Sequence, residues 1–192
     1  EILRCLVGSE MCIRDSMRNT EEENIQEHSH MVAVLAHALG VIRRDIFHQP
    51  CDVNALATAA LYHDASEILT GDLPTPIKYH NAEIMSAYHA VEDLAVQKLL
   101  GMLPPELRET YADVLAEDKD GDIYPLVKAA DKLSAYIKCI EERKAGNNEF
   151  LSAEAQTRAA LEASPLPEVQ YFLEHFIPAF ERDLDELGAI GQ

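Results

Sequence analysis

The sequence predicts an all-α protein that folds as a single helical bundle of six or seven helices. Three observations lead to this prediction. Apolar residues recur every three or four positions over most of the chain, which is the period of an amphipathic helix. No segment alternates apolar and polar residues as a half-buried strand does. Finally, the prolines and glycines cluster between the periodic segments, where they begin or end helices.

The first two predicted helices have well-defined apolar stripes. The stripe of the first helix, residues 25–46, consists of Ile25, His28, Val32, Leu35, Leu39, Ile42 and Ile46. A break follows at residues 48–50, and Asp52 is the predicted N-cap of the second helix. The stripe of the second helix consists of Val53, Leu56, Ala60, the pair His63 and Asp64, and Glu67. This helix is expected to end before Gly71.

The rest of the chain divides into a loop and further helices. Residues 71–76 read GDLPTP, and we predict a rigid loop there because each proline disfavours helix before it. Helices are predicted over residues 81–103, 105–116, 124–144, 150–163 and 169–187, the last with a kink or a restart at Pro178. Residues 117–122 are polar and are predicted to form another loop.

The N-terminal segment, residues 1–16, has no clear period and contains two of the four cysteines. We interpret it as an atypical segment, either a translated cloning remnant or an ordinary flexible tail. The folded domain is therefore placed at residues 17–192.

Composition narrows the class of partners. Sixteen basic and 34 acidic residues give a net charge of −18, which should repel nucleic acid polymers and anionic membranes. No apolar run is long enough to span a bilayer, and no signal peptide is visible. The four cysteines form no metal-binding spacing, so we expect reduced thiols and a cytoplasmic protein. A small phosphate ester would still bind where cations or a metal reverse the local field.

Several polar residues stand on the apolar stripes. His28, His63, Asp64 and Glu67 all face the predicted core. Burying a neutral polar group without a partner costs roughly 2–7 kcal/mol, so these side chains must meet partners, a metal or a water-filled cleft. An imidazole beside a carboxylate suits a divalent cation held between helices. For each histidine, the alternative is a side chain that is hydrogen-bonded in the core and binds no metal. An isolated His–Asp pair is also common by chance.

Other candidates are weaker from spacing alone. Asp131 lies among small residues of a largely apolar helix, and an exposed pair with Lys128 or Lys132 is its alternative. Glu67 is a candidate general base, or else part of a helix-end ion pair. Asp72 and Lys78 flank the proline-rich loop, and Arg18 precedes the first helix. No nucleophile motif and no glycine-rich phosphate loop are present.

Taken together, these residues resemble the HD-domain superfamily, whose signature H…HD…D matches His28, His63–Asp64 and Asp131 in order. The sequence resembles the bacterial 5′-deoxynucleotidases of that superfamily more closely. The segments that carry this likeness are residues 17–20 (MRNT), 23–29 (ENIQEHS), 62–78 (YHDASEILTGDLPTPIK) and 145–150 (AGNNEF). The resemblance covers residues 17–187.

The resemblance implies hydrolysis of deoxyribonucleoside 5′-monophosphates by a homodimer that needs one divalent ion, cobalt, manganese or another. It implies that His28, His63, Asp64 and Asp131 hold the metal and that Glu67 and Asp72 are catalytic. In this scheme Glu67 or Asp72 orients the attacking water or accepts its proton, and Arg18 or Lys78 stabilises phosphoryl charge. The expected substrate contacts are Arg14, Arg18, His28, Asp64, Asp72, Leu73, Pro74, Thr75, Lys78 and Asp131.

One departure from the family pattern bears on the substrate. The family has an Arg-Trp pair shortly before its Met-Arg-Asn, but the corresponding residues here are Ile13 and Arg14, and the chain has no tryptophan. Phosphate orientation and selection of the deoxy sugar are therefore in question, with Arg14 as the one candidate substitute. Two rival functions remain open: an HD phosphohydrolase for cyclic nucleotides, triphosphates or guanosine polyphosphates, and a non-catalytic, metal-stabilised scaffold that binds a nucleotide.

Overall fold

The computed structural model describes residues 20, 23–71, 80–116 and 121–182, and all regular elements in these ranges are helical. The prediction of an all-α fold is thereby confirmed. The helices of nine or more residues are α2 (Ile25–Val41), α3 (Val53–Tyr62), α6 (Ala82–Gly101), α7 (Pro105–Leu115), α8 (Tyr124–Lys144), α9 (Leu151–Glu162) and α10 (Pro167–His175). Shorter pieces are the π-helix Ile42–Ile46, α4 (Glu67–Thr70), the 3-10 helix Asn148–Phe150 and α11 (Ile177–Glu181).

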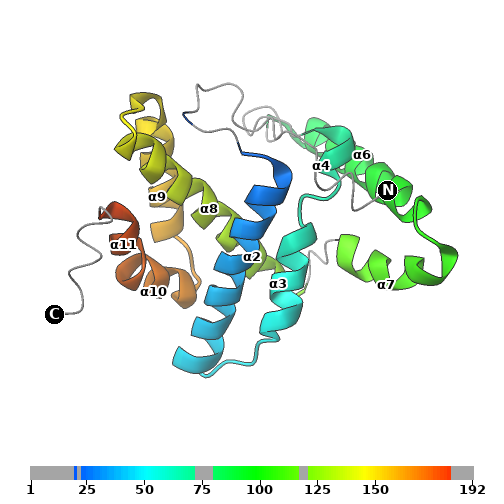
Figure 1. The fold of residues 1–192 in the computed structure, drawn as a ribbon, viewed down its shortest axis with the longest axis horizontal. Helices are drawn as coiled ribbons and strands as arrows, with labels where there is room; N and C mark the ends of the chain where they lie inside the picture. Colours follow the sequence, from blue (N-terminus) through cyan, green and yellow to red (C-terminus); the bar gives the residue numbers. More distant parts are fainter. Residues whose placement is uncertain (1–19, 21–22, 72–79, 117–120, 183–192) are drawn as a thin grey trace.

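Helix α2 lies at the centre of the molecule and packs against both α3 and α8 (Figure 1). Helices α9, α10 and α11 lie on one side of this central group, and α4, α6 and α7 lie on the other. The main core is built from the inner faces of α2, α3 and α8, with α9, α10 and α11 contributing Leu161, Val169, Phe172 and Ile177. None of the helices in the described ranges is sufficiently long and apolar to cross a membrane.

A second, smaller apolar cluster lies on the side of α6 and α7. It consists of Ala65, Leu99, Leu100 and Leu115, with partly buried neighbours around them. Ala60 of α3 belongs to the main core, whereas Ala65 belongs to this second cluster. The segment between them, which contains His63 and Asp64, therefore connects two apolar clusters.

Helix ends follow local chemistry. Asn24 caps α2 through a capping box, in which its side chain accepts from the Glu27 N–H and Glu27 accepts from the Asn24 N–H. Asp52 caps α3, as predicted, by accepting from the N–H groups of Asn54 and Ala55. Gly71 follows α4 with a φ of 66°, a conformation that favours glycine. The bounds of α8 agree with the predicted range 124–144.

Two predicted helices differ from the structure. The stripe of Val53 to Glu67 was expected to lie on one helix, but α3 ends at Tyr62 and residues 63–66 form turns before α4. The prediction of a single helix was wrong because turns can also place apolar and polar residues on one side of a chain. The last helix is divided at Phe176, next to the predicted kink at Pro178, into α10 and α11. The predicted loop at residues 72–76 lies outside the described residues.

Small residues let α2 and α3 approach closely. Ala33, Ala36 and Gly40 are buried along α2. A Cβ atom on Gly40 would lie 3.0 Å from Leu56 Cδ2 and 3.3 Å from Val53 Cγ1, closer than side chains ordinarily pack. Gly40 therefore leaves room for Leu56 and Val53 to pack against α2 at the end far from His28.

Candidate metal centre

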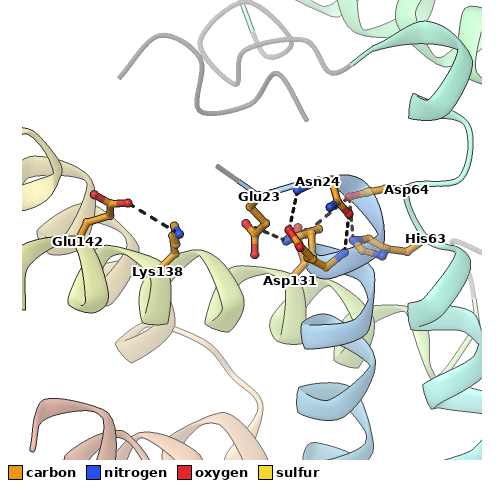
Figure 2. Close-up of polar contacts among 9 residues, drawn as sticks. Glu23, Asn24, His63, Asp64, Asp131, Lys138 and Glu142 are labelled. Atoms are coloured by element: carbon orange, nitrogen blue, oxygen red, sulfur yellow. Dashed lines mark hydrogen bonds and ion pairs between the residues drawn. The ribbon is translucent and has the colours of Figure 1, made fainter. Parts of the chain in front are cut away.

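Three separate elements bring the predicted ligands together (Figure 2). His28 lies in the first turn of α2, which is fixed by the Asn24 cap. His63 and Asp64 lie in the turns after α3, and Asp131 lies in the middle of α8. His28, His63 and Asp64 are buried, as their positions on the apolar stripes predicted, whereas the Asp131 side chain is 38% exposed.

The ligand atoms converge on one point. One potential ligand atom from each of His28, His63 and Asp64 lies within 4.8 Å of the other two. Asp64 Oδ2 is 3.1 Å from His63 Nε2 and 3.5 Å from His28 Nε2. Asp131 Oδ1 is 3.2 Å from His28 Nε2, so its close contact is with this histidine. The arrangement offers two imidazoles and two carboxylates, a donor set that suits several divalent transition metals.

Hydrogen bonding leaves ring nitrogens turned toward this point. His63 Nδ1 lies 2.8 Å from the Ala60 carbonyl oxygen, so Nδ1–H donates there and Nε2 is the ring nitrogen left to bind a metal. Despite its nearness to Asp64, His63 Nε2 has no hydrogen bond within the described part of the chain. A buried imidazole nitrogen 3.1 Å from a carboxylate oxygen fits a cation ligand, because a cation would supply the missing partner. These residues therefore fit a divalent metal.

Electrostatics favour charged carboxylates at the site. Burial alone would raise the pKa of Asp64 and of Asp131, but the pKa of each is held below its ordinary value. For Asp64 the opposing cause is the charge of His63, and for Asp131 it is the hydrogen bond from His28. Burial would lower the pKa of His63, yet the Asp64 carboxylate raises it overall. Both carboxylates are thus ready to bind a cation, which would replace the imidazole protons.

Glu67 stands directly after the turn that carries the ligands. It is 5% exposed, is the first residue of α4, and donates its N–H to the Asp64 carbonyl oxygen at 3.0 Å. The sequence prediction that Glu67 is buried on the same side as His63 agrees with this position. The remaining expected site residues lie outside the described residues: Arg14, Arg18, Asp72, Leu73, Pro74, Thr75 and Lys78.

One neighbour of the ligands was missed by sequence reasoning. Glu23 Oε2 lies 4.0 Å from His28 Nδ1, the ring nitrogen opposite the convergence point (Figure 2). His28 Nδ1 has no hydrogen bond among the described residues. Carboxylates in this position commonly orient metal-ligating histidines. The available signal was the capping box at Asn24 and Glu27, which fixes the helix start and so places Glu23 beside the first turn.

A cavity of about 350 Å³ adjoins the site, and His63 lines it. Its other lining residues come from the turn at Ser66, from α6 and from the end of α7. No sequence pattern predicted this cavity, because its walls come from residues far apart along the chain.

Comparison with known proteins agrees with this geometry. A family model described as "5′-deoxynucleotidase YfbR-like" matches residues 12–180, a range that includes all four proposed ligands. The chain belongs to this YfbR-like family. The curated 5′-deoxynucleotidase YfbR of Shigella flexneri is 50% identical over 173 residues, covering 90% of this chain and 87% of that protein. An Escherichia coli protein of the same name is 49% identical over 173 residues, again covering 90% of this chain and 87% of that protein.

Solved structures support the fold. An HD-domain phosphohydrolase from Listeria innocua superposes with a TM-score of 0.81 at 26% identity, covering 95% of this chain and 88% of that one. A Pyrococcus horikoshii protein has a TM-score of 0.67 at 21% identity and covers 94% of this chain and 95% of its own; it shows the same fold. Membership of the YfbR-like family agrees with the H…HD…D resemblance, and the fold is that of an HD-domain protein.

Proposed function

We propose that this protein is a metal-dependent 5′-deoxynucleotidase that hydrolyses deoxyribonucleoside 5′-monophosphates to deoxynucleoside and phosphate. The observation that carries the proposal is the convergence of His28, His63 and Asp64, with Asp131 beside His28, in a chain whose relatives are named 5′-deoxynucleotidases. These four residues are the proposed ligands of one divalent ion, cobalt or manganese. Such an ion would stabilise phosphoryl charge and provide a nucleophilic water near neutral pH.

The chain's own residues supply positioning and proton transfer. Glu67 is buried beside the ligand turn, which suits a carboxylate that orients water or accepts its proton. Asp72 is the proposed second catalytic carboxylate, and residues 72–75 the proposed wall of the nucleotide site. Arg14, Arg18 and Lys78 are the proposed cations for the phosphate, which the overall charge of −18 would otherwise repel. His28, Asp64 and Asp131 would also lie next to the bound phosphate.

The test is phosphate release from a panel of 2′-deoxy and ribonucleoside 5′-monophosphates after removal of metal and addition of cobalt, manganese, zinc or magnesium. We expect turnover of the deoxy substrates with cobalt or manganese and none with a chelator. Activity only on a cyclic nucleotide, triphosphate or guanosine polyphosphate would move the protein to another substrate class. Metal binding with no hydrolysis of any of these would make it a binding scaffold.

We also propose that the protein is a cytoplasmic homodimer whose domain spans residues 17–192, with residues 1–16 an atypical segment. The acidic surface supports a small nucleotide rather than a nucleic acid polymer or a membrane as the partner. Light scattering after size-exclusion chromatography should give twice the mass of 21.4 kDa. A monomer mass at micromolar concentration would rule out the dimer. A variant that begins at Met17 should retain the melting temperature if the domain boundary is right.

A further inference from the structure

One segment that carries the family likeness has no part in the metal centre. Residues 145–150 (AGNNEF) follow the last turn of α8. Gly146, with a φ of 87°, turns the chain back, and the Asn147 N–H donates to the Glu142 carbonyl oxygen at 2.9 Å. The Asn147 side chain is held on both sides, because its Oδ1 accepts from the Glu149 N–H and its Nδ2 donates to Glu142 Oε2 at 2.8 Å. This turn therefore fixes the carboxylate of Glu142.

Glu142 binds a part of the chain that is far away in sequence. Its side chain is 1% exposed; Oε1 accepts from the Thr20 N–H at 3.1 Å, and Oε2 accepts from the Thr20 hydroxyl at 2.9 Å. Thr20 itself is exposed, so a buried carboxylate holds a surface residue in place. Hydrogen bonds to a charged acceptor are stronger than neutral ones. Glu142 lies roughly three turns from Asp131, so both side chains leave the same side of α8 (Figure 2).

The anchored Thr20 is close in sequence to groups that serve the metal centre. Three residues after it, Glu23 lies 4.0 Å from His28 Nδ1. Two residues before it stands Arg18, one of the cations proposed for the phosphate. Two residues of extended chain span at most about 7 Å, so fixing Thr20 restricts the space that the Arg18 side chain can reach.

We propose that Glu142 is a positioning residue for phosphate recognition, because it holds Thr20 so that Arg18 is presented to the phosphate of a nucleotide at the metal centre. A side chain whose backbone is already fixed loses less conformational freedom when its ligand binds. Fixing a cation matters in a chain with a net charge of −18, which otherwise repels the phosphate. Glu142 contacts neither metal nor substrate in this scheme and acts only through Thr20. The inference rests on the proposed function, to which it adds a residue outside the site.

The test is a double-mutant cycle between E142Q and R18Q on the metal-loaded protein. A glutamine keeps the shape of Glu142 but has one oxygen that accepts hydrogen bonds, where the carboxylate has two. The kcat/KM for dAMP is measured with manganese, and binding of inorganic phosphate to the manganese-loaded protein is measured by calorimetry. The matched control is E154Q, which breaks the ion pair between Glu154 and Arg143, the neighbour of Glu142 on α8, and leaves Thr20 untouched.

We expect E142Q to lower the kcat/KM for dAMP and to weaken phosphate binding by about ten-fold, with manganese affinity unchanged. In the R18Q protein the same substitution should change neither quantity by more than about two-fold, because the group that it positions is already gone. E154Q should lose stability without either effect. T20V removes the hydroxyl donor at an exposed position and should give a smaller loss, which T20S should restore; this pair decides the question if E142Q does not fold.

Equal losses from E142Q with and without Arg18, or an unchanged kcat/KM and phosphate affinity, would overturn the inference even if wild-type turnover supports the nucleotidase. Phosphate binding that depends jointly on Glu142 and Arg18, in a protein that turns over no nucleotide, would support the positioning role and reject the nucleotidase. A protein that neither binds phosphate nor hydrolyses nucleotides would reject both.

Discussion

Two carboxylates of helix α8, Asp131 and Glu142, lie roughly three turns apart and differ in what surrounds them. Asp131 is partly exposed and faces His28 in a cluster where His63 Nε2 and His28 Nδ1 lack hydrogen bonds among the described residues. Glu142 is 1% exposed, and accepts from the N–H and the hydroxyl of Thr20 and from the Asn147 side-chain amide. Lys138 Nζ lies 3.8 Å from Glu142 Oε1 (Figure 2).

Both carboxylates have a lowered pKa, but for different reasons. Burial would raise each pKa; at Asp131 histidines oppose it, and at Glu142 the hydrogen bonds from Asn147 and Thr20 do so. The donors around Glu142 are chiefly neutral and belong to the protein, so this site is complete without a ligand. The donor to Asp131 is the His28 imidazole, whose Nε2 proton a bound cation would replace. A lowered pKa by itself therefore does not distinguish a structural carboxylate from a functional one.

The largest effect should come from removing the shared ligand oxygen. Asp64→Ala should abolish binding of Mn²⁺ or Co²⁺ and bring phosphate release below detection, because Asp64 Oδ2 lies within 3.5 Å of the Nε2 atoms of both His28 and His63. Calorimetric metal titration and a phosphate assay measure the two effects, and circular dichroism should show retained helix. Glu83→Ala, at an exposed position on α6, serves as the control. Metal binding at wild-type affinity in the Asp64 variant would remove this residue from the ligand set.

The second-largest effect is expected at Glu67, where a substitution should separate metal binding from the catalytic step. Glu67→Gln should retain metal affinity and lose about 10²-fold or more in kcat, as expected when a general base loses its charge. Stopped assays at saturating deoxynucleotide, with metal affinity measured on the same preparation, test the separation. An unchanged kcat would assign Glu67 a purely structural role at the start of α4.

The structural carboxylate should affect stability rather than metal binding. Glu142→Gln should lower the free energy of unfolding by about 1–3 kcal/mol, because hydrogen bonds to a charged acceptor are replaced by weaker ones. The folded pKa of Glu142 is below the ordinary value of 4.5, so its contribution is fully present above that pH. This stability is lost as the pH falls through the folded pKa.

Urea unfolding over a series of pH values measures this contribution. The wild type should lose stability on acidification more steeply than Glu142→Gln, and the two should differ most above pH 4.5. Metal affinity should be unchanged by the substitution. A loss of metal affinity comparable to that of Asp64→Ala would show that the two ends of α8 are not independent.

The smallest effect is expected at Glu23, which lies in sequence between Thr20, the partner of Glu142, and His28, the partner of Asp131. Glu23→Gln should weaken metal binding by about ten-fold, at the low end of what partners of ligating histidines contribute. The cause is a weaker preference for Nδ1–H on His28, whose Nδ1 is 4.0 Å from the carboxylate. Metal titration followed by Co²⁺ absorbance would detect this change. Unaltered affinity and spectrum would show that 4.0 Å is too far for Glu23 to orient the ring.

The local features of the fold were predictable, whereas contacts between distant segments were not. Helix α8 was predicted with its observed bounds because Pro125 follows its first residue and Gly146 follows its end. The burial of His28 and His63 also followed from periodicity alone. The turns at residues 63–66 and the π-helix Ile42–Ile46 were missed because spacings of three and four do not distinguish these from α-helix.

The partners of the polar residues depended on tertiary structure. Asp131 had Lys128 and Lys132 as equally plausible partners by spacing, and only packing of α8 against α2 brings it to His28. Glu142 binds Thr20 across 122 positions of sequence, a contact that no local pattern contains. The cavity lined by His63 and α6 was invisible for the same reason.

Gly40 has a consequence for how this protein can change. It lies twelve positions after His28, about 18 Å along the axis of α2, and its missing side chain lets Leu56 of α3 pack against the backbone. A larger residue there would require the side chains of Leu56 and Val53 to shift away from α2. The helix that carries His28 is thus sensitive to the size of a single residue at its opposite end.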